Sequence, residues 1–161
     1  MKPTVERLRE LFRYEPATGH LINLVARSSR SPVGRICGTP TPDGYIVVGI
    51  DGKRYYVHVV IWAFVTGAWP EHQIDHENLD KSENWWKNLR PATPQQNRAN
   101  SNMSRNNKSG LKGALFYQGK WRGQITVNRV TKLLYRGDCP AAAHLAYVVE
   151  ANRQFGSFSR S

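Results

Sequence analysis

The chain has 161 residues, of which 40% are hydrophobic and 22% charged, and a net charge of +11. This composition excludes a wholly disordered chain and allows one or two small domains with a modest core. The longest apolar run, residues 57–69, is too short to span a bilayer, and Cys37 and Cys139 are too few for a disulfide scaffold or a four-cysteine zinc site. We therefore expect no membrane partner and a reducing, cytoplasmic location.

The excess of positive over negative charge lies in one part of the chain. Residues 84–137 contain no acidic residue, and their 11 basic residues equal the whole net charge. A solvated surface normally mixes both signs, so this segregation predicts a polyanionic partner, most often nucleic acid.

Six elements are predicted in the first hundred residues from hydrophobic periodicity and turn residues. Thr4 can cap a first helix that Pro16 stops, and Asp51-Gly52 is a strong two-residue turn signal. In chain order we expect a helix over 4–14, a β-hairpin over 45–57, a buried helix over 58–65, a strand over 73–76, a strand over 88–93 and a helix that starts at Pro94.

The last third of the chain has a different pattern. A polar stretch over 101–110 is typical of a linker, because it is rich in Asn, Ser and Lys. Short strands separated by turn residues follow, and then a strong amphipathic helix. These elements are strands over 111–117, 120–127 and 131–136 and a helix over 140–155, which together with the earlier elements predict an α+β fold.

Four polar residues on or near the predicted strands 73–76 and 88–93, which we expect to pair as a hairpin, suggest hydrolytic chemistry. Carboxylate and amide oxygens suit Mg²⁺ or Mn²⁺, so Asp75 and Asn97 are candidate ligands for one divalent ion. A neutral imidazole can take a proton from an attacking water, which makes His76 a candidate general base. Asn88, on the strand expected to pair with that of His76, could hydrogen-bond across to hold the ring. This set is suited to metal-assisted phosphodiester hydrolysis.

The run over residues 58–101 resembles the HNH endonucleases of phages and homing elements. The Asp-His pair, the Asn-Leu-Arg-x-Ala-Thr return strand and the Gln-Asn on the following helix match the family pattern in order and spacing. The resemblance implies a ββα-metal core. It also implies that His76 is the general base, that Asp75 and Asn97 bind the metal, and that Asn88 orients the histidine, as in the H-N-N variants.

A second resemblance covers the C-terminal part. Residues 108–113 (KSGLKG) and 119–125 (GKWRGQI), followed by an Ala-rich helix, resemble the APETALA/ethylene-response-factor DNA-binding domain. This implies a three-stranded antiparallel sheet packed on one helix, with the sheet in the major groove, where arginine can read guanine. The residues that we expect to contact DNA are Arg90, Arg98, Arg105, Lys108, Lys112, Lys120, Arg122, Arg129, Lys132 and Arg136.

These patterns predict a metal-dependent endonuclease that hydrolyses phosphodiester bonds in duplex DNA and leaves 5′-phosphate and 3′-hydroxyl ends. Its segments would be an accessory helix and β-hairpin region over 1–55, the nuclease core over 56–107 and the DNA-binding domain over 108–161. The expected partner is double-stranded DNA and the expected cofactor is one Mg²⁺ or Mn²⁺ ion. We expect no small-molecule cofactor, a monomer rather than a dimer and, for a phage-encoded chain, the host cytoplasm.

Two other interpretations stay open from sequence. One is a non-catalytic phage DNA-binding or regulatory protein on the same scaffold, although simple binding does not explain why four site-type residues occur together. The other is an RNA-binding or RNA-cutting protein, which is disfavoured because the C-terminal sheet lacks the paired aromatic motif of RNA-binding sheets.

Overall fold

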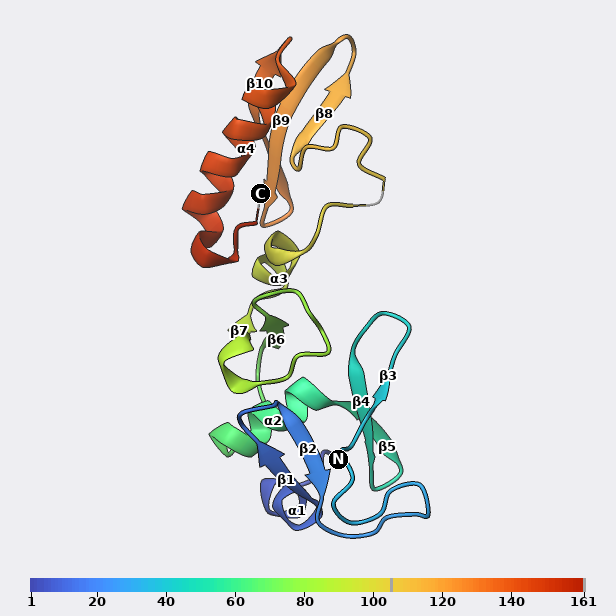
Figure 1. Cartoon of the computed structure of the whole chain (residues 1–161). Coiled ribbons are helices and arrows are strands. Elements are labelled where there is room, and N and C mark those ends of the chain that lie inside the picture. The colour runs from blue at the N-terminus through green and yellow to red at the C-terminus, as the bar shows by residue number, and fades with distance from the viewer. Residues whose placement is uncertain (105, 161) are drawn as a thin grey trace. The chain divides into compact units, whose positions relative to one another are not determined.

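The computed structural model describes residues 1–104 and 106–160 and has an α+β fold (Figure 1). The chain divides into two compact units, of which the first is Met1–Ala92 and the second begins at Thr93. The predicted class is confirmed, because small antiparallel sheets combine with helices and one three-stranded sheet packs on a single helix. Among the described residues, no helix combines the length and the apolar character that crossing a membrane requires.

The first unit contains two α-helices, one 3-10 helix and three small antiparallel sheets. Its elements in chain order are α1 (Val5–Leu11), β1 (Phe12–Glu15), β2 (His20–Asn23), β3 (Thr39–Pro40), β4 (Ile46–Ile50), β5 (Lys53–Tyr56), α2 (Val57–Thr66), β6 (Gln73–His76), the 3-10 helix η1 (Trp86–Asn88) and β7 (Leu89–Ala92).

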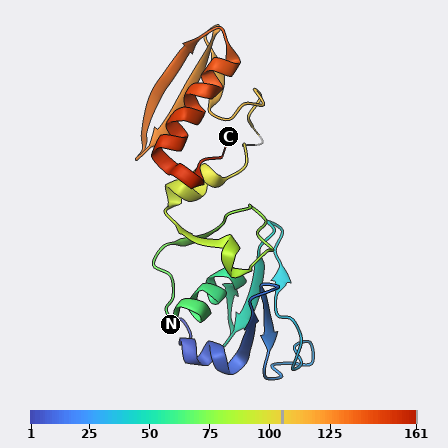
Figure 2. The ribbon, with the colours of Figure 1, turned by 60° about the vertical axis from the view of Figure 1, so that its left-hand side comes forward.

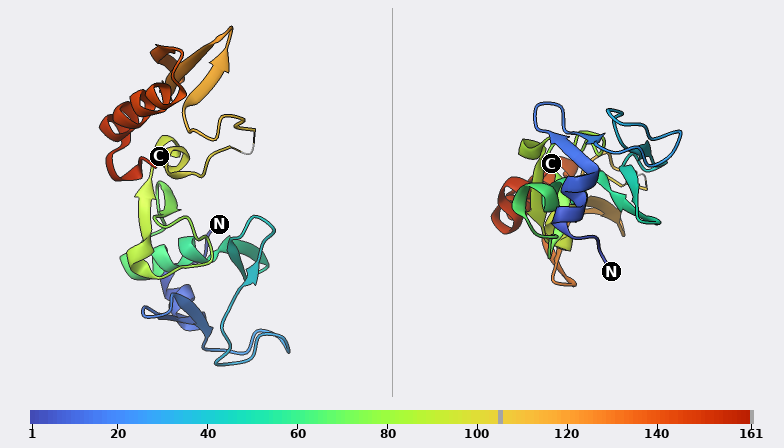
Figure 3. Two further views of the ribbon diagram at one scale, coloured as in Figure 1. Left: turned by 45° about the horizontal axis from the view of Figure 1, so that its top comes forward. Right: turned by 90° about the horizontal axis from the view of Figure 1, so that it is seen from below.

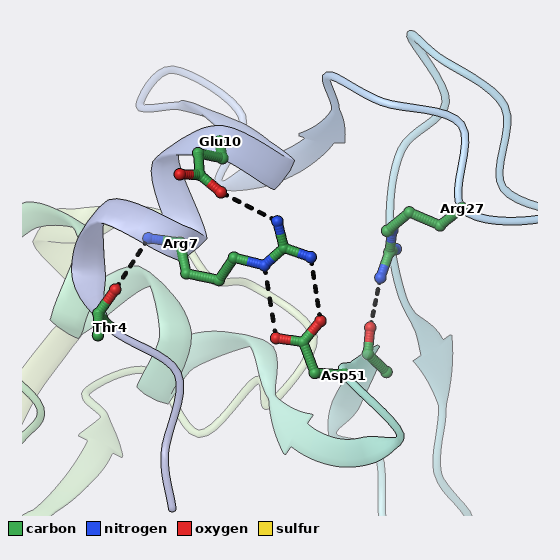
Figure 4. Close-up of polar contacts among 6 residues, drawn as sticks. Thr4, Arg7, Glu10, Arg27 and Asp51 are labelled. Carbon is green, nitrogen blue, oxygen red and sulfur yellow. Dashed lines mark hydrogen bonds and ion pairs between the residues drawn. The ribbon is translucent and has the colours of Figure 1, made fainter.

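The N-terminal helix is shorter than predicted. Thr4 caps α1 as expected, since its hydroxyl accepts a hydrogen bond from the backbone N–H of Arg7 at 3.1 Å. The predicted span of 4–14 is wrong at its end, because Phe12 takes an extended backbone and starts a strand that pairs with β2. Arg7 also bridges to Asp51 in the turn between β4 and β5, which fastens α1 to that hairpin (Figure 4).

The predicted hairpin over 45–57 and the helix after it are both present. Asp51 and Gly52 adopt the positive φ angles, 46° and 78°, that a tight two-residue turn requires. The chain enters α2 directly after β5, and α2 ends at Gly67 in the left-handed conformation that favours glycine at a helix end.

One hydrophobic core holds the first unit together. Helix α1 packs against α2 (Figure 3), and buried residues of both helices join apolar residues of β1, β2 and β4. Ile74 of β6 and Leu89 of β7 belong to the same cluster. The hairpin that carries the predicted catalytic residues is therefore anchored in the core of this unit.

The second unit is a sheet with one long helix on it. Its elements are α3 (Pro94–Asn100), β8 (Ala114–Tyr117), β9 (Lys120–Val127), β10 (Val130–Gly137), α4 (Pro140–Phe155) and the 3-10 helix η2 (Gly156–Phe158). The strands are antiparallel in the order β10-β9-β8, and α4 runs along one face (Figure 2). A Cβ added at Gly123 in β9 would lie 2.3 Å from the carbonyl oxygen of Ala143, so glycine permits this close approach.

The division into units differs from the predicted segment boundaries after residues 55 and 107. Helix α2 packs with α1 in the first unit, and α3 packs with α4 and η2 in the second. Packing thus assigns α3 to the unit of the three-stranded sheet. The predicted segments stay a proposal about function.

Candidate functional site

The β6–β7 hairpin carries the predicted Asp-His pair on β6. The antiparallel register places Asp75 opposite Arg90 and His76 opposite Leu89. Neighbouring residues of a strand point to opposite faces, yet both Asp75 and His76 are buried. Each therefore needs polar partners on its own side of the hairpin.

His76 is held in one orientation by an asparagine that the sequence reasoning missed. The ring is 3% exposed, and its Nε2 lies 3.1 Å from Oδ1 of Asn84. Asn84 donates from Nδ2 to the carbonyl oxygen of Ser82 at 2.9 Å, which turns its Oδ1 toward the histidine. Since an amide oxygen only accepts, Nε2 carries the proton and Nδ1 of the neutral ring keeps the lone pair. Burial lowers the pKa of His76, so the ring is neutral at pH 7.

Asn88 contacts the loop between the strands. Its Oδ1 accepts from the backbone N–H of Asn78 at 3.0 Å, and its Nδ2 donates to the carbonyl oxygen of Glu83 at 2.8 Å. Both ends of the amide thus brace the 77–85 loop. The sequence predicted that Asn88 itself would orient His76, whereas in the structure Nε2 of His76 donates to Oδ1 of Asn84.

The sequence holds one signal for Asn84. It precedes Trp85 and Trp86, and the Trp86 ring packs on that of Trp62 at 5.0 Å between centroids. A pair of large aromatic residues at the end of a polar loop indicates that the loop end is buried. A buried asparagine then needs hydrogen-bond partners.

The first β-hairpin supports the backbone of this loop end. The hydroxyl of Tyr14 donates to the carbonyl oxygen of Asn84 at 3.5 Å. A Cβ added at Gly19, whose φ is +73°, would lie 2.3 Å from the backbone nitrogen of Trp85. The β1–β2 turn therefore packs directly on the segment that positions the partner of His76.

Asp75 is paired with Arg90. Its Oδ2 accepts from Nε of Arg90 at 3.1 Å, and the two side chains are only 5% and 14% exposed. Glu77 lies 3.9 Å from the same guanidinium. Arg90 was predicted to contact DNA, but this geometry favours an internal role, in which the guanidinium balances a buried carboxylate.

His58 packs against His76 as part of a cluster of aromatic rings. The two rings meet edge to face with centroids 4.8 Å apart, and the Tyr45 and Tyr56 rings lie 5.3 and 5.5 Å from His58. Burial, with a smaller contribution from the His76 charge, lowers the pKa of His58 to about 3. A neutral His58 therefore packs against the candidate base.

Asn97 lies on α3 in the second unit. The Thr93 hydroxyl accepts a hydrogen bond from the backbone N–H of Gln96, and the Gln96 side-chain oxygen accepts one from the backbone N–H of Thr93. These two bonds form a capping box at the start of α3. The backbone N–H of Asn97 donates to the Thr93 carbonyl oxygen at 2.9 Å. The pairing of Asn97 with Asp75 at one ion stays a prediction from sequence.

The donor set fits a hard divalent ion. Within residues 1–104 and 106–160, no three His, Cys, Asp or Glu side chains gather in a form that could hold a metal. Mg²⁺ does not need such a group, because it keeps several waters and often uses one or two protein carboxylates together with substrate phosphates. A buried carboxylate such as that of Asp75 is the type of protein ligand that this kind of site uses.

The sheet of the second unit places two arginines side by side on the face away from α4. Arg122 in β9 pairs directly with Arg136 in β10, and the Arg122 guanidinium lies 4.3 Å from the Tyr117 ring centroid. Like charges directly opposite each other in a sheet are destabilising. Such a pair therefore indicates an anionic partner more than a structural role.

Other predicted DNA-contact residues have partners within the unit. Lys132 lies 3.7 Å from Glu150 of α4, and Lys120 pairs with Asp138 at 2.7 Å. Lys112 donates to the backbone at the end of α3. The remaining candidates of the described chain, all with exposed side chains, are Arg98, Lys108 and Arg129, while Arg105 lies outside the described residues.

Comparisons with known proteins find similarities to a protein family, to a phage protein and to a solved structure. Residues 55–99 match the family HNH_3, described as HNH endonuclease. Protein 3.8 of Escherichia phage T7 is 33% identical over 81 residues, which cover 46% of this chain and 67% of that protein. A solved structure, described as "DNA binding and cleavage by the HNH homing endonuclease I-HmuI", is 19% identical with a TM-score of 0.43, covering 97% of this chain and 84% of the other.

Proposed function

Since the chain belongs with phage Protein 3.8 to one family and carries an HNH endonuclease domain over residues 55–99, we propose that it is a metal-dependent endonuclease that cuts duplex DNA. The observation that carries the proposal is the state of His76. Asn84 holds its Nε2, burial keeps the ring neutral, and the candidate metal ligand Asp75 is its chain neighbour. The predicted 5′-phosphate and 3′-hydroxyl ends are part of this proposal.

In the proposed reaction, His76 acts as general base. Its Nδ1 takes a proton from a water that attacks the scissile phosphorus, while Asn84 keeps the ring in place. Asp75 and Asn97 would hold the divalent ion, Mg²⁺ or Mn²⁺. When bound, that ion supplies charge stabilisation at the phosphate and the leaving 3′ oxygen. Arg90 holds the Asp75 carboxylate in position from the neighbouring strand.

The second unit is proposed to bind the DNA. Arg122 and Arg136 form a like-charge pair on the open face of a three-stranded sheet, a shape that fits the major groove. Arg98, Lys108 and Arg129 would add phosphate contacts, which give affinity without sequence information. The resemblance to the APETALA/ethylene-response-factor domain, a monomeric state and the absence of a small-molecule cofactor are likewise proposals.

One observation favours the alternative of a DNA-binding protein without catalysis. The Asp75 carboxylate already accepts a hydrogen bond from Arg90 at 3.1 Å. If this ion pair persisted on DNA, the guanidinium would stand in for the metal and no hydrolysis would follow. The same scaffold would then bind duplex DNA only.

A plasmid relaxation assay tests catalysis. With Mg²⁺ or Mn²⁺, the wild-type chain should convert supercoiled plasmid to nicked or linear DNA, and His76→Ala should lower the rate by about 10²–10⁴-fold because the general base is gone. His72→Ala, an exposed histidine four residues earlier, is the matched control and should cut like wild type.

The outcomes separate the two functions. Cutting by wild type that stops in EDTA and in His76→Ala supports the endonuclease. Equal retention of duplex DNA in a gel shift by wild type and His76→Ala, with cutting by neither, would instead identify the non-catalytic binding protein. Competition with duplex RNA in the same gel shift tests the RNA interpretation.

A further inference from the structure

We propose that the sheet-and-helix module of the second unit holds α3 at both ends and thereby positions Asn97, with Lys112 and Asn128 as the positioning residues. This inference rests on the proposed role of Asn97 as a metal ligand. It assigns Lys112, which the sequence predicted to contact DNA, to the organisation of the metal-binding helix.

The C-terminal end of α3 is held by Lys112. The Lys112 ammonium donates to the carbonyl oxygens of Ala99 and Ser101 at 2.7 and 2.8 Å. The last carbonyls of a helix have no partner inside the helix, and a lysine can satisfy them and favour the negative end of the helix dipole. One side chain thus takes two backbone acceptors at the point where α3 stops.

Lys112 is itself fastened to α4. Its carbonyl oxygen accepts from Nδ1 of His144 at 2.8 Å. The next residue, Gly113, has φ +75° and packs so closely on the Tyr147 ring that an added Cβ would lie 2.0 Å from Cγ. The backbone at residues 112 and 113 therefore contacts α4 at two points, and the side chain of Lys112 extends from this fixed backbone to the end of α3.

The N-terminal end of α3 has a second tether. Gln95 donates from Nε2 to Oδ1 of Asn128 at 2.8 Å. Asn128 lies in the turn between β9 and β10 and has a positive φ of 51°. This turn belongs to the sheet that is proposed to bind DNA, so a side chain of the DNA-binding module reaches the first turn of α3.

The two tethers enclose Asn97. Gln95 and Ala99 lie two residues before and after it on a helix of seven residues. Such a short helix has little stability of its own in water, because nucleation is costly and few backbone bonds follow. Its order therefore depends on the tertiary contacts, and so does the placement of an amide that is to bind an ion.

The test uses full-length variants and two readouts. Lys112→Met removes the donors at similar length, Lys112→Arg keeps a cationic donor, and Lys108→Met changes an exposed lysine of the same stretch as control. Asn128→Gly removes the amide acceptor and keeps a residue that tolerates the positive φ. The readouts are amide hydrogen exchange of a peptide over 94–101 and Mn²⁺ affinity without DNA, from the electron paramagnetic resonance signal of free Mn²⁺.

We expect Lys112→Met to raise the exchange rate of the 94–101 peptide and to weaken Mn²⁺ binding about tenfold, as loss of an outer support of a metal site does. Asn128→Gly should act in the same direction, Lys112→Arg should restore most of both signals, and Lys108→Met should change neither. Circular dichroism establishes that each variant is folded.

Three results would overturn the proposal. Folded Lys112→Met and Asn128→Gly with wild-type exchange would show that the tethers do not order α3. Faster exchange with unchanged Mn²⁺ affinity would show that α3 is held for another purpose than metal binding. A wild-type chain that binds no Mn²⁺ would defeat the ligand role of Asn97, and hence the proposed function, whatever the exchange data show about α3.

Discussion

At the scale of single residues, the first unit buries two histidines against each other. His58 and His76 are 5% and 3% exposed, and their rings meet edge to face. Burial lowers the pKa of each, and that of His58 falls to about 3. The folded chain therefore keeps both rings neutral at pH 7, which suits a base on His76 and a packing role for His58.

This burial predicts acid sensitivity. The unfolded chain binds a proton on His58 below pH 6.5, whereas the folded chain stays neutral there down to about pH 3. Protonation of the unfolded chain therefore leaves the free energy of unfolding unchanged above pH 6.5. Below that pH the free energy of unfolding falls by up to about 1.4 kcal/mol for each pH unit. Urea unfolding in EDTA at a series of pH values measures this loss.

The variant His58→Phe isolates the effect. Phenylalanine keeps an aromatic ring beside His76 and cannot be protonated, so its free energy of unfolding should depend less steeply on pH than that of wild type. Parallel curves for the two proteins would show that another group causes the acid sensitivity.

At the scale of elements, the β1–β2 hairpin acts as a support for the loop that ends in Asn84. Its turn residue Gly19 packs against the backbone of Trp85, and Tyr14 of β1 donates to the carbonyl oxygen of Asn84. The hairpin contains no candidate catalytic residue. Its contribution to the site is to fix where the partner of His76 lies.

Replacing Gly19 by alanine should therefore cost more than backbone strain alone. Gly52 has nearly the same φ, +78° against +73°, but nothing lies within 4 Å of an added Cβ there. Gly52→Ala should lower the free energy of unfolding by about 1–2 kcal/mol from left-handed strain, and Gly19→Ala should lower it further. Urea midpoints compare the two, and equal losses would mean that the close contact with Trp85 relaxes without cost.

At the scale of the whole molecule, the charge is divided unequally between the units. Residues 1–92 carry 12 basic and 10 acidic residues, whereas residues 93–161 carry 11 basic and only 2 acidic ones. The first unit is nearly neutral and holds the candidate catalytic hairpin. The second unit has a net charge of +9 and so holds most of the excess positive charge, as expected if it supplies the affinity for a polyanion.

DNA binding should therefore weaken steeply with salt, and the slope should depend on the open face of the sheet. Arg122→Ala with Arg136→Ala should reduce affinity for duplex DNA and flatten the salt dependence by about one unit for each arginine that no longer neutralises a phosphate. Lys132→Ala is the control, because Lys132 pairs with Glu150 of α4. Fluorescence anisotropy at a series of salt concentrations measures the affinity and its salt dependence. An unchanged slope in the double variant would show that this face of the sheet does not contact DNA.

Much of the fold follows from local sequence alone. Thr4 and Thr93 cap helices, Asp51-Gly52 and Asn128-Arg129 make turns, and α4 has the predicted bounds of 140–155. These features depend on neighbouring residues, whose steric and hydrogen-bonding preferences act over a few positions. The Asp75-His76 pair and the basic excess of the C-terminal part are equally visible in the sequence.

Only the tertiary structure decided which side chains serve one another. Packing ends α1 at Leu11. Packing also brings together the hydrogen-bonded pairs that are distant in sequence: His76 with Asn84, Asp75 with Arg90, and Lys112 with the end of α3. Residue type shows that a lysine or an asparagine can bond, but burial and distance select its partner. For that reason composition and spacing determined the chemistry available to this chain, and folding determined which residues carry it and which hold them in place.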